Sequence, residues 1–302
     1  MTRAEGPALL LYWTFIIGTT LARVVPLRVS YGIARLVGVA TYYAWTGGRR
    51  RCIQNMRHIT AGDERASRRF ARASFANYLV YLVDFFRLLG TTRDRIDARV
   101  RTNTWDTVRE EHADEGIVLM TMHYGNWDLG AAMVAVHGTP VAAIADRFPN
   151  ARVNDFVIGS RQHLGMRIIP ADRMGPSLLR ALRNHEVVAV LLDIPASEAS
   201  VRVTFFGDTI AVSDGPARLA LRTGAAVVVG MVERIRSWDD EMRADATAVP
   251  FVPTGDEVVD ARALTQAVFS VFERQVRRDP TQWYIFRNLW PDDALAAAAP
   301  TA

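Results

Sequence analysis

The middle of the chain alternates between short apolar runs and longer amphipathic segments. Short runs rich in Val, Ile, Leu and Ala are typical of strands buried on both faces, and the amphipathic segments are typical of helices. The pattern predicts strands at residues 117–122, 141–145, 166–169, 186–192, 201–206, 225–232 and 242–252. It predicts helices at residues 104–114, from 127 onward, and at 151–164, 176–184, 217–223 and 260–278. Such alternation predicts an α/β fold, with a central, mostly parallel sheet flanked by helices.

The first sixty residues differ from the rest because long apolar stretches lie next to arginines. Pro7–Ala22 carries no charge, and its length falls just short of the ~20 residues that a straight spanning helix needs. Tyr31–Trp45 carries Arg35 in its interior and aromatic residues at its end, and three arginines follow at 49–51. Such a segment is typical of helices that lie in, or barely cross, the cytoplasmic leaflet. We therefore expect residues 1–60 to associate with the plasma (inner) membrane at its cytoplasmic face, the alternative being ordinary core helices.

The remaining chain is predicted to form one α/β domain at residues 61–292, followed by a disordered Ala-rich tail at 293–302. Residues 63–90 carry an aromatic stripe at helical spacing, which predicts a helix packed on the core. Arg93–Arg101 alternates in charge, and we expect it to connect that helix to a short strand.

The stretch with the most chemistry is H-Y-G-N-W-D at residues 123–128. It follows a predicted buried strand, so His123 should lie at a carboxyl end of the sheet, where open α/β sheets bind their ligands. Gly125 supplies a tight turn, Asn126 is a strong helix N-cap, and Asp128 falls in the first helical turn. A His bonded to a carboxylate is a general base with its orienting group, which predicts a His123–Asp128 pair. The alternative is a buried His that only satisfies a backbone group.

Polar residues also follow two further predicted strands. Asp146 and Arg147 follow one strand and Asp193 follows another, so parallel strands would bring all three to the same mouth as His123. Arg147 is a natural anchor for a phosphate or carboxylate, or else forms a surface salt bridge with Asp146. Asp193 would accept hydrogen bonds from sugar or glycerol hydroxyls, or would orient Arg147. An Asp after a strand is also often a plain turn former.

Composition narrows the classes of function. The chain has 302 residues, a net charge of +4 and a pI of about 9.6, which indicate a mild preference for anionic partners such as an anionic membrane surface. A single cysteine, Cys52, excludes an intramolecular disulfide and a multi-cysteine metal site. There is no His-x-His or His-x3-His pair, and there is no nucleotide-binding or G-x-S-x-G motif. We expect no metal, no cofactor and no nucleic-acid partner.

The H-Y-G-N-W-D motif resembles the His-x4-(Asp/Glu) signature of the bacterial lipid A lauroyl/myristoyl acyltransferase family, which includes phosphatidylinositol mannoside acyltransferase. Further matching features stand in the family's order along residues 7–292. They are A-D-R at 145–147, the buried strand ending at Asp193, V-T-F-F-G at 203–207 leading to D-G-P-A-R-L-A-L-R-T-G-A, and P-T-Q-W-Y at 280–284.

The resemblance implies that His123 is the catalytic base and Asp128 its partner. It places Asp146 and Arg147 near the acceptor and Asp193 beside the active site, and we count Asn126 with them among the substrate-binding residues. Many lipid A enzymes carry Gln after the acid at position 193, whereas this chain has Ile194-Pro195, which leaves the acceptor open.

The function expected from this resemblance is O-acyl transfer from a thioester, acyl-CoA or acyl-carrier protein, to a hydroxyl of a membrane glycolipid or lysophospholipid. Two other functions fit the same residues. A thioester hydrolase would use the His/Asp pair to activate water, and a non-catalytic membrane lipid-binding protein would bind without turnover.

Overall fold

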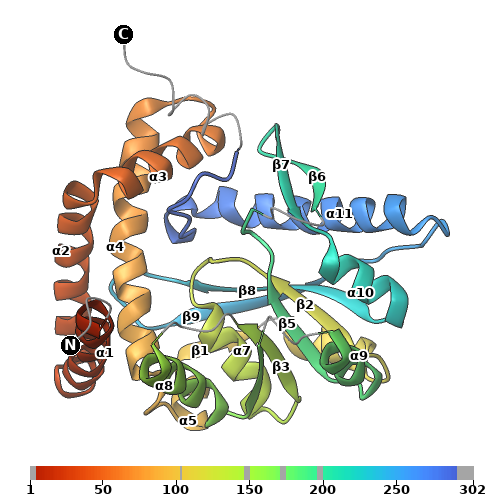
Figure 1. Ribbon diagram of the computed structural model, residues 1–302, viewed down its shortest axis with the longest axis horizontal. Coiled ribbons are helices and arrows are strands. Elements are labelled where there is room, and N and C mark those ends of the chain that lie inside the picture. Colours follow the sequence, from red (N-terminus) through yellow and green to blue (C-terminus); the bar gives the residue numbers. More distant parts are fainter. Residues whose placement is uncertain (1–4, 103, 146–149, 171–174, 196–199, 291–302) are drawn as a thin grey trace.

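The computed structural model describes residues 5–102, 104–145, 150–170, 175–195 and 200–290, with side chains from residue 12 onward. A seven-stranded sheet lies between two layers of helices, and four N-terminal helices pack along one side of this body (Figure 1). The helices are α1 (Glu5–Val24), α2 (Leu27–Ala44), α3 (Thr46–Ile59), α4 (Glu64–Leu88), α5 (Arg93–Arg99), α6 (Trp105–Glu111), α7 (Trp127–Val136), α8 (Ala151–Gln162), α9 (Gly175–Arg183), α10 (Gly215–Thr223) and α11 (Glu257–Arg278). The strands are β1 (Val100–Thr102), β2 (Ile117–Thr121), β3 (Val141–Ala145), β4 (Met166–Pro170), β5 (Val187–Leu191), β6 (Ser200–Phe205), β7 (Asp208–Ser213), β8 (Ala226–Arg234) and β9 (Met242–Ala248).

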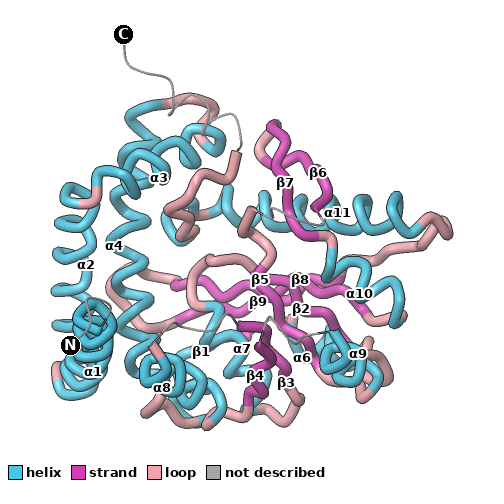
Figure 2. Tube along the Cα trace, viewed as in Figure 1, coloured by secondary structure: helices cyan, strands magenta, loops and turns pink. Residues whose placement is uncertain are grey.

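The sheet has the strand order β1-β9-β8-β2-β5-β3-β4. Strands β8, β2, β5, β3 and β4 run parallel, whereas β9 is antiparallel to β8 and β1 follows the direction of β9. The predicted α/β class and mostly parallel sheet are therefore confirmed. Figure 2 shows the separate β6–β7 hairpin standing outside this sheet.

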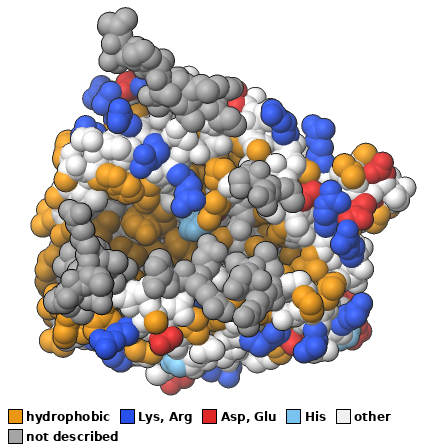
Figure 3. Space-filling view, in the orientation of Figure 1, with side chains coloured by type: hydrophobic (Ala, Val, Ile, Leu, Met, Phe, Trp, Pro, Cys, Tyr) orange, Lys and Arg blue, Asp and Glu red, His pale blue; other side chains and the backbone are white. Residues whose placement is uncertain are grey.

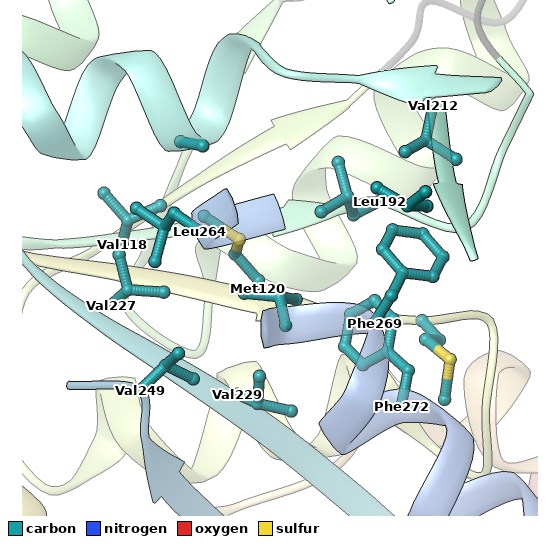
Figure 4. Close-up of a cluster of buried hydrophobic side chains, with 14 of the residues drawn as sticks. Val118, Met120, Leu192, Val212, Val227, Val229, Val249, Leu264, Phe269 and Phe272 are labelled. Carbon is teal, nitrogen blue, oxygen red and sulfur yellow. The ribbon is translucent and has the colours of Figure 1, made fainter. Parts of the chain in front are cut away.

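Strand β2 lies near the centre of the sheet and is buried on both faces, as its unbroken apolar sequence predicts. Val118 and Met120 point to the core under α10 and α11, while Ile117 and Leu119 point to the core under α6 and α7. Figure 4 shows the first core, in which the valines of β2 and β8 meet Leu264, Phe269 and Phe272 of α11. The rigid centre of the sheet therefore fixes the loop that follows β2.

The N-terminal helices pack tightly on one another but leave an apolar face uncovered. A Cβ at Gly38 of α2 would lie 2.6 Å from the backbone of α4, so glycine allows these two helices to touch. Large apolar side chains of α1 and α2 are exposed, up to 77% for Val24 and 74% for Leu36. These helices are therefore not core helices buried all round. No helix in the described part of the chain is both long enough and apolar enough to cross a bilayer.

Two segments differ from their predicted structure. The connector expected at Arg93–Arg101 contains helix α5 before the short strand β1. The strand predicted at 201–206 is confirmed as β6, but positive-φ backbone at Phe206 and Gly207 then turns the chain into a second strand, β7, which was not predicted. Local sequence patterns did not reveal α5 and β7, because both elements are short and depend on packing against the rest of the fold.

Candidate active site

The loop after β2 turns sharply and carries His123. The Tyr124 amide donates to the Met122 carbonyl at 2.7 Å, and Gly125 follows with a φ of +58°. Asn126 then caps α7, because its side-chain oxygen accepts from the Leu129 amide at 3.0 Å. The strand–turn–helix corner predicted from the sequence is therefore confirmed.

Two other segments hold this loop in place. The Gly125 amide donates to the Gln282 carbonyl, and the Asn126 amide donates to the Val232 carbonyl of β8, each at 2.9 Å. A Cβ at Gly125 would lie 1.7 Å from that Val232 oxygen. Glycine is therefore required here both for its positive φ and for the close approach of β8.

The side-chain partner of His123 is Asp193. Ring atom Nδ1 lies 2.8 Å from Oδ1 of Asp193, and the His123 backbone amide donates to Oδ2 at 3.0 Å. The indole Nε1 of Trp283 donates to the same Oδ2, also at 3.0 Å. Because the carboxylate accepts from these N–H donors, Nδ1 must carry the ring proton, which leaves Nε2 as the basic nitrogen.

The strand register explains this pairing. Strands β2 and β5 are parallel neighbours, with Thr121 opposite Leu191. His123 and Asp193 each stand two positions beyond those residues, so they emerge side by side at the carboxyl edge of the sheet. Asp193 is fully buried, while 23% of the His123 side chain is exposed. The acid is thus sealed beneath the ring, and the ring reaches the surface of a cavity.

Opposing influences act on the pKa of His123. Burial lowers it, but the Asp193 carboxylate and its hydrogen bond raise it more, and the positive charge of Arg287 lowers it again. The net effect is a pKa raised above the ordinary value of 6.5. The ring is therefore a stronger base than a free imidazole, and the basic form becomes available as the pH rises through this raised pKa.

The predicted pairing of His123 with Asp128 is wrong. Asp128 accepts a hydrogen bond from the Tyr81 hydroxyl and one from Nε of Arg161, both at 2.7 Å. Its place in the first turn of α7 directs the carboxylate towards α4 and α8 rather than towards the ring. Tyr81 in turn stacks on Trp127, with ring centroids 4.1 Å apart, and Trp127 meets His123 edge to face. Asp128 thus contacts groups that surround the histidine.

His123 lies at a cavity of about 760 Å³ with mostly aromatic and aliphatic walls. Side chains from α1, α4, α8 and the segment after α11 form these walls, and Tyr284, with a pKa raised above the usual range by burial, is among them. In Figure 3 the visible face is hollowed, hydrophobic side chains line the hollow, and a histidine and arginines lie at its edge. The cavity has the shape and polarity to hold a hydrocarbon chain next to the basic nitrogen.

The sequence profile of the family described as bacterial lipid A biosynthesis acyltransferase matches residues 2–291. The chain belongs to this family. The resemblance seen in the motifs is thereby confirmed, and the protein is an acyltransferase by family.

Three similar proteins all carry the name phosphatidylinositol mannoside acyltransferase. A phosphatidylinositol mannoside acyltransferase of Mycolicibacterium smegmatis is 24% identical over 287 residues, which cover 91% of this chain and 90% of that protein. Phosphatidylinositol mannoside acyltransferases of two Mycobacterium tuberculosis strains are 29% identical over 183 residues, covering 59% of this chain and 55% of each of those proteins.

The other residues predicted for the candidate site fall into two groups, those outside the described residues and those within them. Asp146 and Arg147 lie outside the described residues. Asn126 is 3% exposed, and its amide nitrogen donates to Asp84 at 3.4 Å while its oxygen caps α7, so its position favours support of the loop over contact with substrate. Asp193 is fully buried, so it does not offer its carboxylate to a hydroxyl of substrate as predicted; it holds the ring of His123 instead.

Sequence reasoning missed the contribution of the segment after α11. The Tyr284 amide donates to the His123 carbonyl at 2.8 Å, and Trp283 forms a bridge with Tyr124 besides its bond to Asp193. This explains the P-T-Q-W-Y motif, which pairs with the His123 loop. Arg287 follows in the same segment, is exposed, and lines the cavity. In the described part of the chain, no group of three or more His, Cys, Asp or Glu side chains is close enough to hold a metal ion.

Proposed function

We propose that this acyltransferase moves a fatty acyl chain from a thioester, acyl-CoA or acyl-carrier protein, to a hydroxyl of a membrane glycolipid or lysophospholipid, with His123 as general base. The observation that carries the proposal is a histidine whose Nδ1 is bound by the buried Asp193 and whose ring lies at the wall of a large apolar cavity. A ring held this way is fixed in one tautomer, with Nε2 free to take a proton.

The proposed reaction needs one proton carrier and no covalent enzyme intermediate. Nε2 of His123 takes the proton of the acceptor hydroxyl, and the oxygen attacks the thioester carbonyl carbon. The tetrahedral intermediate collapses, the carbon–sulfur bond breaks, and the thiolate leaves. The imidazolium then returns its proton to that thiolate, which restores the basic ring. Asp193 stabilises the imidazolium while it exists.

An oxyanion forms in this reaction and needs positive charge or hydrogen-bond donors. The amides of residues 123–126 already donate to Asp193, Met122, Gln282 and Val232, so the loop itself has none to offer. Arg161 is bound to Asp128. Arg287 lines the cavity, its charge acts on His123, and it has no carboxylate partner among the described residues. We assign Arg287 to the negative charge of the reacting group or of the donor's phosphates.

The aromatic cavity is the proposed binding place for the acyl chain. Phe15 of α1, Phe85 of α4 and Val157 of α8 come from different helices, so the cavity wall includes the N-terminal helices. Burial of a hydrocarbon chain contributes about 0.8 kcal/mol per CH₂ group, so a long chain gains most of its affinity here.

The exposed apolar face of α1 and α2 is the proposed contact with the membrane surface. Trp13, Ile17, Leu21 and Val24 recur at helical spacing on α1, and all are about half exposed or more. Apolar faces of this kind, flanked by arginines, lie in the headgroup region of a bilayer. Such a position would bring the aromatic cavity, which Phe15 of the same helix lines, close to lipid substrates.

The acceptor class rests on the relatives. Those with 24% and 29% identity are named phosphatidylinositol mannoside acyltransferases, which favours a hydroxyl of a mannosylated or similar glycolipid as acceptor.

The test is acyl transfer from palmitoyl-CoA to lipid acceptors in mixed vesicles, followed by mass spectrometry. We expect His123→Ala to keep substrate binding and to lose turnover by about 10²–10⁴-fold, the contribution of a general base. His137→Ala is the matched control, because His137 caps the C-terminus of α7, is exposed, and among the described residues bonds to Met133 and Asp97. Equal turnover in both variants would contradict the proposed base. Free fatty acid as the main product with every acceptor would favour the hydrolase, and unchanged donor in the wild type would favour a binding protein.

A further inference from the structure

A second cavity, of about 630 Å³, lies where the N-terminal helices meet α5, and four arginines line it together with Thr91 and Asp240. Arg23 comes from the last turn of α1, Arg87 from the last turn of α4, and Arg95 and Arg99 from α5. This cavity shares no lining residue with the cavity at His123. It is therefore a separate feature of the molecule.

The carboxylates near this cavity are already paired with other groups, Asp84 with Arg99 and Arg234 and Asp240 with Arg99. Arg99 bonds to Asp84 at 2.8 Å and to Asp240 at 3.2 Å, and Asp240 is the acidic residue among the described lining residues. Arg23, Arg87 and Arg95 have no ion pair within the described chain. Within the described residues, the Arg87 guanidinium donates to the Val25 carbonyl and that of Arg95 to the Gly90 carbonyl. Three guanidinium groups thus line this cavity without a carboxylate partner of their own among the described residues.

One of these guanidinium groups has a buried donor without a partner. Nε of Arg87 is shielded from solvent and has no hydrogen-bond partner in the structure. Burial lowers the pKa of Arg87; the nearby Tyr31 and Asp84 partly offset this, and the charges of Arg99 and Arg95 lower the pKa again. A buried, unpaired cationic donor beside like charges is costly unless an anion completes its surroundings. The planar N–H donors of arginine match the oxygens of a phosphate group.

We propose that the Arg23–Arg87–Arg95 cavity binds a phosphate group, and that its source is the headgroup of an anionic phospholipid in the bilayer. Arg23 stands between exposed apolar residues of α1, with Leu21 at 55% and Val24 at 77% exposure, and Val29 of α2 continues that surface at 51%. A helix lying in the bilayer surface places its apolar side chains among the acyl chains and its flanking arginines at the level of the phosphates. The cavity opens beside such side chains, so a headgroup reaches it without leaving the bilayer.

The experiment measures binding of the full-length protein to two kinds of vesicle with equal surface charge. One contains phosphatidylcholine with phosphatidylinositol, and the other contains phosphatidylcholine with a fatty acid, which brings charge without an additional phosphate. The wild type should prefer the first kind. In Arg23→Gln/Arg95→Gln, the ratio of the affinities for the two vesicle kinds should fall about tenfold. The control Arg28→Gln/Arg65→Gln removes the same charge from exposed positions outside the cavity and should keep it.

A second arm separates a lipid from a soluble ligand. Thermal unfolding is followed in inorganic phosphate and in chloride at equal ionic strength, and both variants should unfold at the wild-type temperature in chloride. If phosphate raises the unfolding temperature of the wild type but not of the cavity variant, and the two proteins show the same vesicle preference, the cavity binds free phosphate rather than a lipid. Wild-type behaviour of the cavity variant in both arms, or an equal loss in the control variant, would overturn the proposal.

Discussion

Two buried aspartates, Asp193 and Asp128, lie close to the same cavity but bind different groups. Asp193, at the end of β5, receives N–H donors only and binds the ring of His123. Asp128, at the start of α7, binds the Tyr81 hydroxyl and the Arg161 guanidinium. The residue five positions from the histidine in sequence therefore supports the cavity wall, and the residue seventy positions away forms the pair. Register across the sheet, not distance along the chain, decides which acid meets the base.

The sharpest test of this difference is Asp193→Asn against Asp128→Asn. An amide at position 193 can donate to Nδ1, which stabilises the wrong tautomer and places the ring proton on Nε2. We expect turnover to fall by about 10²–10⁴-fold, close to the loss of the base itself. The change Asp128→Asn should lower turnover far less. Steady-state kinetics of acyl transfer checks both, and a larger loss in Asp128→Asn would mean that the motif pair is the functional one.

The next largest effect is expected from the loop that carries the base. Gly125→Ala would place a methyl group 1.7 Å from the Val232 carbonyl oxygen at a positive φ, so the loop must move. A shift of about 1 Å in a catalytic group can cost about 10²-fold. Turnover should fall by this amount while acyl-chain binding persists. Gly138→Ala, also at positive φ but with no atom within 4 Å, is the control for backbone strain alone. Similar turnover in the two variants would contradict the assigned close contact.

Asp128 is expected to affect stability more than chemistry. Asp128→Ala leaves the Arg161 guanidinium, 17% exposed in its side chain, without its carboxylate. Breaking one side of a buried pair costs about 3 kcal/mol, measured as the free energy of unfolding in urea. The fall in kcat/KM should be about tenfold or less, equivalent to about 1.4 kcal/mol of activation free energy. An unchanged unfolding free energy would argue against a structural role for the ion pair.

The smallest effect is a shift along the pH axis. Because the pKa of His123 is raised above 6.5, the ring is protonated and inactive below that raised value and becomes a base above it. We expect kcat/KM to rise with pH, with a midpoint above 6.5. In Asp193→Asn the raising charge is lost and burial still lowers the pKa, so the ring should titrate at a lower pH. Nuclear magnetic resonance of the ring nitrogens measures this directly, and an unchanged midpoint would contradict the electrostatic pairing.

Much of the fold was predictable because β2 to α7 obeys local rules. The apolar run, the glycine turn and the Asn126 cap each have one good structural solution, and the structure confirms all three. The partner of His123 was harder to predict, because finding it requires knowing that β5 is the neighbour of β2 and that the two strands align in register. Counting two residues past each strand would then have found Asp193.

Other features could not be predicted from local patterns because they depend on contacts between distant segments. The P-T-Q-W-Y motif was noticed, yet only the tertiary fold shows that Trp283 and Tyr284 bind the histidine loop. The four arginines of the second cavity come from three helices, and a chain in which every Lys/Arg position is Arg offers no local signal for them.

The bonds between the histidine loop and residues 282–284 have a consequence for biosynthesis. The ring, its acid and the turn are all encoded before residue 194, but the strand-like segment that fastens them is translated some ninety residues later. A nascent polypeptide that still lacks that segment would expose the histidine loop and the side of Asp193 that Trp283 covers in the folded protein. A chain released before that segment is made would contain His123 and Asp193 but would not hold the loop in position. Such a chain would be inactive and open to proteolysis.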